Sequence, residues 1–165
     1  MTIPTPHAGR ALIVSVSDPL ALSGEDDGSG GLVTELLTEA GFTVDGTVAV
    51  PSDATDIRNA LNTAIIGGVD LVVTLGGTGL SPRDVTPDVT ADVIDRELPG
   101  VTQALHWSGM AAGVVDAVLS RGLVGVSGST LIANIASSRA AIRDGLATLI
   151  PLATHVVSEL TDPGN

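Results

Sequence analysis

A glycine-rich stretch near the middle of the chain carries residues whose types and spacing suit chemistry on an anionic substrate. It reads Leu75-Gly-Gly-Thr-Gly79 and continues, after Leu80, as Ser81-Pro-Arg-Asp-Val-Thr-Pro-Asp-Val-Thr90. Glycines let the backbone turn tightly and approach a ligand, and the N–H groups of such a loop beside a helix start suit a phosphate. A plain tight turn is the alternative interpretation. The candidate phosphate-binding residues are Gly76, Gly77, Thr78 and Gly79.

Two charged residues follow this loop, and each has a chemical and a structural interpretation. Bound phosphates would repel the carboxylate of Asp84 unless Mg²⁺ lay between them, so the chemical interpretation makes Asp84 a catalytic residue and a Mg²⁺ ligand. The structural interpretation is a negative charge that stabilises the start of the following helix. Arg83 either binds a phosphate or pairs with a nearby acid.

The chain resembles the MogA/MoaB family of molybdenum cofactor biosynthesis proteins and is closer to the MoaB type. The family carries TGGTG followed by PRDVTP, an acid and AT, and here only the first threonine and the late alanine differ. The resemblance covers most of the chain and implies a molybdopterin-binding fold, with the glycine loop lining a molybdopterin and nucleotide pocket. The implied activity is adenylylation of molybdopterin with Mg-ATP, by a homotrimer or homohexamer. The alternative is a non-catalytic paralogue that binds a pterin or another protein.

The family pattern S-x-S-D-R is matched in part near the N-terminus. It corresponds here to Ser15, Ser17 and Asp18, with Pro19 in place of the arginine. The resemblance makes these three retained residues candidate ligands of the substrate.

A second functional carboxylate of the family lies in a Pro-Asp pair. Here Ser52 takes that place, and Asp53 follows one residue later. Asp53 therefore either serves as the second catalytic acid or provides the N-terminal charge of the next helix.

The C-terminal part matches the family pattern G-x-x-G-x-T-L-I-x-N over residues 125–134, which makes Asn134 a candidate ligand. The family's next loop, P-G-S-P, binds the pterin and reads Ala136-Ser-Ser-Arg139 here. Ser137 and Ser138 are therefore candidate ligands. Arg139 either restores a positive charge or is the first exposed residue of the last helix.

The composition argues against several classes of function and of site. The net charge of −12 argues against non-specific nucleic-acid binding, and the absence of lysine excludes the usual P-loop mechanism. With no cysteine there are no disulfides or thiolate sites, and no G-x-S-x-G elbow supports a hydrolase. No apolar run reaches the roughly 18 residues of a membrane span, and residues 1–10 do not resemble a signal peptide. We expect a soluble cytoplasmic protein.

Hydrophobic periodicity predicts alternating strands and helices, hence an α/β three-layer sandwich around a mostly parallel sheet. In such folds ligands bind at the carboxyl ends of the strands, where the glycine loop falls. We expect an N-terminal extension over 1–10, a single domain over 11–160 and a polar tail over 161–165. The expected strands are 11–16, 42–50, 69–75, 123–126 and 130–135. The expected helices are 32–40, 57–66, 86–98, 101–112 and 138–160, the last kinked or restarted at Pro151, with 17–31 as loop.

Overall fold

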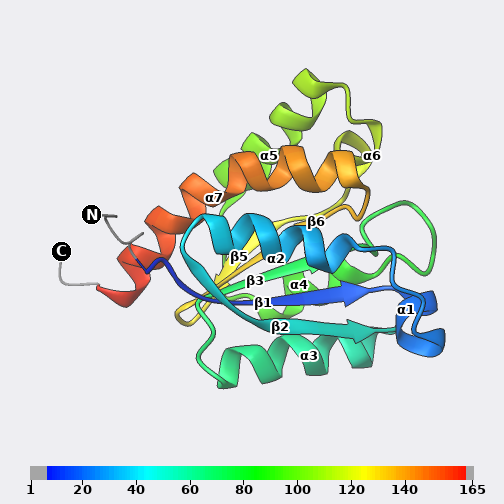
Figure 1. Ribbon diagram of the computed structural model, residues 1–165, viewed down its shortest axis with the longest axis horizontal. Coiled ribbons are helices and arrows are strands. Elements are labelled where there is room, and N and C mark those ends of the chain that lie inside the picture. Colours follow the sequence, from blue (N-terminus) through cyan, green and yellow to red (C-terminus); the bar gives the residue numbers. More distant parts are fainter. Residues whose placement is uncertain (1–6, 163–165) are drawn as a thin grey trace.

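A computed structural model describes residues 7–162, in which strands and helices alternate along the chain (Figure 1). The strands are β1 (Gly9–Val16), β2 (Phe42–Val50), β3 (Leu71–Leu75), β4 (Arg96–Glu97), β5 (Val124–Ser127) and β6 (Thr130–Ile135). The helices are α1 (Asp18–Ser23), α2 (Ser29–Glu39), α3 (Ala54–Ile66), α4 (Thr86–Val93), α5 (Pro99–Ala112), α6 (Val115–Leu119) and α7 (Arg139–Thr161).

The strands form one sheet in the order β2-β1-β3-β6-β5-β4. The first four strands in that order run parallel, whereas β5 and β4 each pair antiparallel with the preceding strand. The predicted mostly parallel sheet is therefore confirmed. Because β1, β3 and β6 are adjacent and parallel, their carboxyl ends meet at one edge of the sheet.

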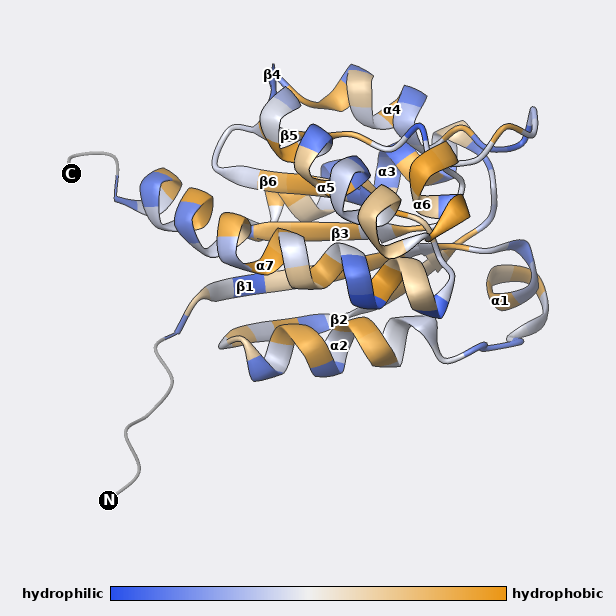
Figure 2. Cartoon of the chain, turned by 90° about the horizontal axis from the view of Figure 1, so that it is seen from above, coloured by the Kyte–Doolittle hydropathy of each residue, from blue (hydrophilic) through white to orange (hydrophobic). Residues whose placement is uncertain are grey.

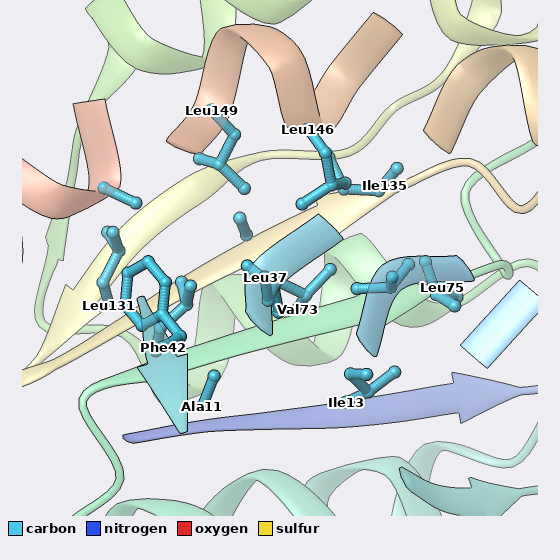
Figure 3. Packing of buried hydrophobic residues seen from close by; sticks show 14 of the residues in the cluster. Ala11, Ile13, Leu37, Phe42, Val73, Leu75, Leu131, Ile135, Leu146 and Leu149 are labelled. Carbon is cyan, nitrogen blue, oxygen red and sulfur yellow. The ribbon is translucent and has the colours of Figure 1, made fainter. Parts of the chain in front are cut away.

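Both faces of the sheet are covered, as the continuous burial of the central strands requires. On β3, Leu71, Val73 and Leu75 belong to the core beneath α2 and α7, whereas Val72 belongs to the core beneath α3 and α4. Figure 3 shows Leu37 of α2 and Leu146 and Leu149 of α7 meeting in the first of these cores. The predicted three-layer sandwich is confirmed.

The predicted loop over 17–31 is wrong, because it contains α1 and the start of α2. Ser17 caps α1 by accepting a hydrogen bond from the Leu20 N–H, Pro19 lies in its first turn, and Gly24 ends it in a left-handed conformation. No residue of α1 is buried. A helix without a buried face has no apolar periodicity, so the pattern misses it.

The predicted helix over 86–98 is too long, since α4 ends at Val93 and β4 follows. The N–H groups of Asp95 and Leu98 donate to the carbonyls of Val126 and Val124, both at 2.8 Å. Pairing with β5 therefore replaces the last helical turn.

The termini of the domain differ slightly from the expected bounds. Gly9 and Arg10 belong to β1, and α7 continues through Pro151 to Thr161. The rest of the predicted extension and tail lies largely outside residues 7–162. Within those residues, no helix is both long and apolar enough to cross a membrane.

On α5, the large apolar side chains of Trp107 and Met110 are exposed to solvent.

Candidate functional site

A cavity of about 420 Å³ opens where β3 and β6 end. It is lined by the glycine loop 76–80, by Asp84, by Asp116 and Leu119 of α6, and by residues 136–137. Its volume lies within the range of small-molecule sites, roughly 300–1,000 Å³. The cavity therefore joins the predicted phosphate loop to segments about 40 and 60 residues later in the chain.

The shape of the loop depends on two glycines with positive φ, Gly76 at 86° and Gly77 at 69°. A Cβ on Gly76 would lie 2.7 Å from the Val16 carbonyl oxygen, and one on Gly77 would overlap Oγ1 of Thr86. The Thr86 N–H donates to the Gly77 carbonyl at 3.1 Å. Glycine is therefore required at both positions, for conformation and for space.

Thr86 joins the glycine loop to α4. Val85 is the N-cap of the helix, and Thr86 is its first residue. Its hydroxyl is buried against the glycine loop and has no hydrogen-bond partner among the described residues. Close packing against Gly77 thus replaces capping at this helix start.

The loop N–H groups divide into bound and available donors. The Gly76 N–H donates to the Ile135 carbonyl at 3.0 Å, so it holds the loop to β6. No acceptor within residues 7–162 takes the N–H of Gly77, Thr78 or Gly79. Three consecutive residues on the cavity wall therefore have free donors, which is the arrangement an anion needs.

Asp84 lies on the same wall, and a local turn fixes its position. Its Oδ2 accepts a hydrogen bond from the Ser81 N–H at 3.0 Å, and its own N–H donates to the Ser81 carbonyl at 2.9 Å. The same oxygen lies 2.9 Å from the position of a Cβ on Gly79. The predicted acid and the predicted phosphate loop therefore share one cavity, while the catalytic role of Asp84 stays a prediction.

Arg121 holds the loop and the acid together, and it is not among the residues that the sequence predicts for the site. Its Nε donates to the Gly79 carbonyl at 3.1 Å and its Nη2 to the Asp84 carbonyl at 2.5 Å. The guanidinium also contacts Asp88 and, by donating a hydrogen bond, lowers the pKa of that carboxyl. The only sequence signal for Arg121 is the run Leu119-Ser-Arg121, which matches a further pattern, L-S-R, of the family that the sequence resembles.

Arg83 pairs with an acid, which is the second of its two interpretations. Its Nη2 lies 2.5 Å from Oδ2 of Asp18, whose Oδ1 accepts a hydrogen bond from the Ser52 N–H at 2.8 Å. Neither Arg83 nor Asp18 lines the cavity. The two predicted ligands instead connect the ends of β1 and β2 to the loop after β3.

The contacts of Asp18 with Ser52 and Arg83 predict that the stability of the fold depends on pH. The Ser52 N–H and then the Arg83 guanidinium lower the pKa of Asp18. A lowered folded-state pKa adds stability above the unfolded pKa of about 4, and that stability is lost as the pH falls through the folded value. We expect Asp18→Asn to lower the urea midpoint at pH 7, with the difference from wild type shrinking below about pH 4. A difference in urea midpoint that does not change with pH would contradict this prediction. Glu35→Gln, on α2, is the control for the loss of one negative charge.

Three candidate residues cap helices instead of lining the cavity. Oγ of Ser17 accepts a hydrogen bond from the N–H of Leu20 at 3.3 Å and caps α1. Oδ2 of Asp53 accepts from Asp56 at 3.0 Å, and Oγ of Ser138 accepts from Ala141 at 3.1 Å. For Asp53 this is the structural interpretation, the N-terminal charge of α3. Any ligand contact of these side chains stays a prediction.

Asn134 is part of a buried hydrogen-bond network. Its Nδ2 donates to Oγ1 of Thr74 at 2.9 Å and of Thr90 at 3.0 Å, and its Oδ1 accepts from the Leu123 N–H at 3.2 Å. The network ties β6 to β3 and α4. Ser15 is also buried, beside Leu75 at the end of β1. Of the candidates outside the glycine loop, the cavity contains Asp84 and Ser137.

The cavity suits a divalent cation that arrives with its substrate. Its acids are Asp84 and Asp116, and no arginine lines it. Within residues 7–162, no group of three or more metal-binding side chains forms a site for a resident ion. Mg²⁺ in phosphate-handling sites is usually bound by one or two carboxylates together with substrate phosphates. Asp84 therefore fits Mg²⁺ that is bound together with phosphate groups.

Comparisons with known families, proteins and structures agree on molybdopterin and molybdenum cofactor proteins. Residues 12–155 match the family described as "Probable molybdopterin binding domain". A molybdopterin biosynthesis protein from Mycobacterium abscessus is 57% identical, with a TM-score of 0.92 and coverage of 96% of this chain and 99% of that chain. Molybdenum cofactor biosynthesis protein B of Bacillus cereus is 32% identical, covering 94% and 92%.

A longer relative is also similar. The molybdenum cofactor biosynthesis bifunctional protein of Chlorobaculum tepidum is 35% identical over 94% of this chain. The present chain spans 50% of that protein's length. The similarity therefore concerns one part of the bifunctional protein.

Proposed function

The chain belongs to the MogA/MoaB family of molybdopterin-binding domains, and from that premise we propose that it binds molybdopterin and adenylylates it with Mg-ATP. The observation that carries the proposal is the cavity in which the free N–H groups of the glycine loop and the carboxylate of Asp84 meet. Both belong to the segment that matches the family motif most closely.

In this reaction a phosphate oxygen of molybdopterin attacks the α-phosphorus of ATP. A new P–O bond forms, the α–β bridge breaks, and pyrophosphate leaves with the electron pair. Catalysis of such a transfer is mostly positioning and electrostatic stabilisation. The N–H groups of Gly77, Thr78 and Gly79 would bind phosphate oxygens, and Asp84 would hold Mg²⁺, which offsets charge on the phosphates.

A non-catalytic pterin-binding protein is the second candidate, and two observations favour it. The carboxylate of Asp53 caps α3 outside the cavity, and the Ser52 N–H is bonded to Asp18. No arginine lines the cavity to stabilise a developing charge. Such a protein would keep the loop and its affinity for pterin phosphate without turnover.

Anaerobic incubation of the purified protein with molybdopterin and Mg-ATP separates the two candidates. Pyrophosphate release and the adenylylated product, identified by mass spectrometry, would support the enzyme. Molybdopterin binding without product would support the carrier, and absence of both would refute the proposed function. Asp92→Asn, on α4 outside the cavity, is a control for loss of one negative charge.

Substitution of Asp53 tests whether it acts as a second catalytic acid. Serine can also cap a helix, so Asp53→Ser removes the carboxylate and keeps the hydrogen bond to Asp56, whereas Asp53→Ala should lower the free energy of unfolding by about 1 kcal/mol. We expect turnover by Asp53→Ser to match wild type, measured with the same product assay. A fall of about tenfold or more, near 1.4 kcal/mol of barrier, would show that the carboxylate itself takes part.

A further inference from the structure

The cavity has a second carboxylate, which comes from α6. Asp116 and Leu119 are three residues apart, so they lie on one side of this short helix, and both line the cavity. Figure 2 shows α6 as a mostly hydrophobic segment beside α5. The cavity wall at α6 therefore combines one acid with apolar surface.

The carboxylate of Asp116 is unpaired in the described part of the chain. No hydrogen bond or ion pair there engages it, whereas the carboxylate of Asp84 accepts one from Ser81. An ionised carboxylate has two oxygens that only accept hydrogen bonds. Asp116 therefore offers its full accepting capacity to whatever occupies the cavity.

The two sides of the cavity differ in the ligand groups that they favour. The free N–H groups of Gly77, Thr78 and Gly79 favour a phosphate, which a carboxylate would repel. Asp84 is the acid held beside this loop, so Asp116 of α6 is left to contact a part of the ligand that donates hydrogen bonds. Leu80 and Leu119, which also line the cavity, are exposed and apolar, and such surfaces favour a flat ring.

We propose that Asp116 accepts two hydrogen bonds, from the 2-amino group and the adjacent ring N–H of a 2-amino-4-oxopyrimidine ring such as that of a pterin. The inference rests on the proposed function and names the residue that selects the ring. Two parallel N–H groups match the two carboxylate oxygens, as in charge-assisted bidentate pairs. A 2-oxo analogue places an acceptor against the carboxylate instead, and such sites discriminate strongly against it.

The test compares 6-hydroxymethylpterin phosphate with 6-hydroxymethyllumazine phosphate, which carries oxygen in place of the 2-amino group. Titration calorimetry at pH 7 measures both dissociation constants for the full chain, without ATP. We expect wild type to bind the pterin about tenfold or more tightly than the lumazine. Asp116→Asn should reduce this ratio to near one, while Asp92→Asn, with the same loss of charge outside the cavity, should keep it.

Each result decides the inference. Loss of the ratio in Asp116→Asn, with lumazine binding retained as evidence of a folded site, supports it. Pterin preference that survives in Asp116→Asn overturns it and leaves the proposed function standing. Failure of wild type to bind either compound overturns the inference, and the molybdopterin assay then decides the proposed function separately. Loss of Mg²⁺-dependent ATP binding in Asp116→Asn with an unchanged ratio assigns Asp116 to the metal and overturns ring selection.

Discussion

Asp84→Asn should lower the rate of molybdopterin adenylylation by more than about tenfold, or roughly 1.4 kcal/mol of barrier, without unfolding the protein. The asparagine side chain has the same shape, and its amide oxygen can still accept the hydrogen bond from the Ser81 N–H. The substitution therefore leaves the turn after the glycine loop in place. It removes the negative charge that would hold Mg²⁺ beside the substrate phosphates.

The measurement is pyrophosphate release at saturating molybdopterin and Mg-ATP, with the unfolding midpoint in urea as a check on folding. Asp92→Asn has the same charge change on α4, where Asp92 contacts Arg58, and should keep the wild-type rate. A wild-type rate in folded Asp84→Asn would remove Asp84 from the catalytic machinery. Glutamate at this position should restore less than the full rate, because one extra methylene moves the carboxylate within the cavity.

Gly77→Ala should lower the free energy of unfolding by roughly 2 to 4 kcal/mol, since the methyl group adds an overlap to an unfavourable backbone conformation. The added Cβ would overlap Oγ1 of Thr86, a buried side chain at the start of α4. Relief of this overlap would displace either the glycine loop or the helix that follows it. Ligand binding should fall together with stability.

Gly68→Ala provides a matched control for the conformational part of this effect. Gly68 has φ of 74°, close to that of Gly77, but a Cβ there would meet no atom within 4 Å. Gly68→Ala should therefore lower the free energy of unfolding by about 1 to 2 kcal/mol. Urea denaturation of both variants, and of Gly77→Ala combined with Thr86→Ala, measures the overlap itself. Equal losses for Gly68→Ala and Gly77→Ala would show that the overlap relaxes without cost.

The fold was largely predictable because its central strands are continuous apolar runs. The residues of β3 and β6 are buried on both faces, so β-branched and leucine residues mark them in the sequence. The loop and Asp84 were predictable as neighbours because nine residues or fewer separate them along the chain. Short pieces such as α1 and β4 were not, since capping and edge pairing form them without a buried face.

The remaining parts of the cavity could not be deduced from local pattern. Arg121 and Asp116 reach the loop only because β6 lies next to β3, which brings the segment before β5 over the glycines. Asp53 and Ser138 show the converse, since the sequence proposes them as site residues. Their residue types suit either a ligand contact or a helix cap. Only the positions of the Asp56 and Ala141 N–H groups show that both side chains cap helices.

The exposed indole on α5 gives the protein an optical reporter. Trp107 is the only tryptophan, the sequence has no tyrosine, and 68% of Trp107 is exposed. Its emission in the isolated chain should resemble that of an indole in water. A second subunit or another protein seated on α5 would exclude water from the ring and shift the emission to shorter wavelength. Spectra recorded over a range of concentrations would therefore reveal assembly through α5 without any added label.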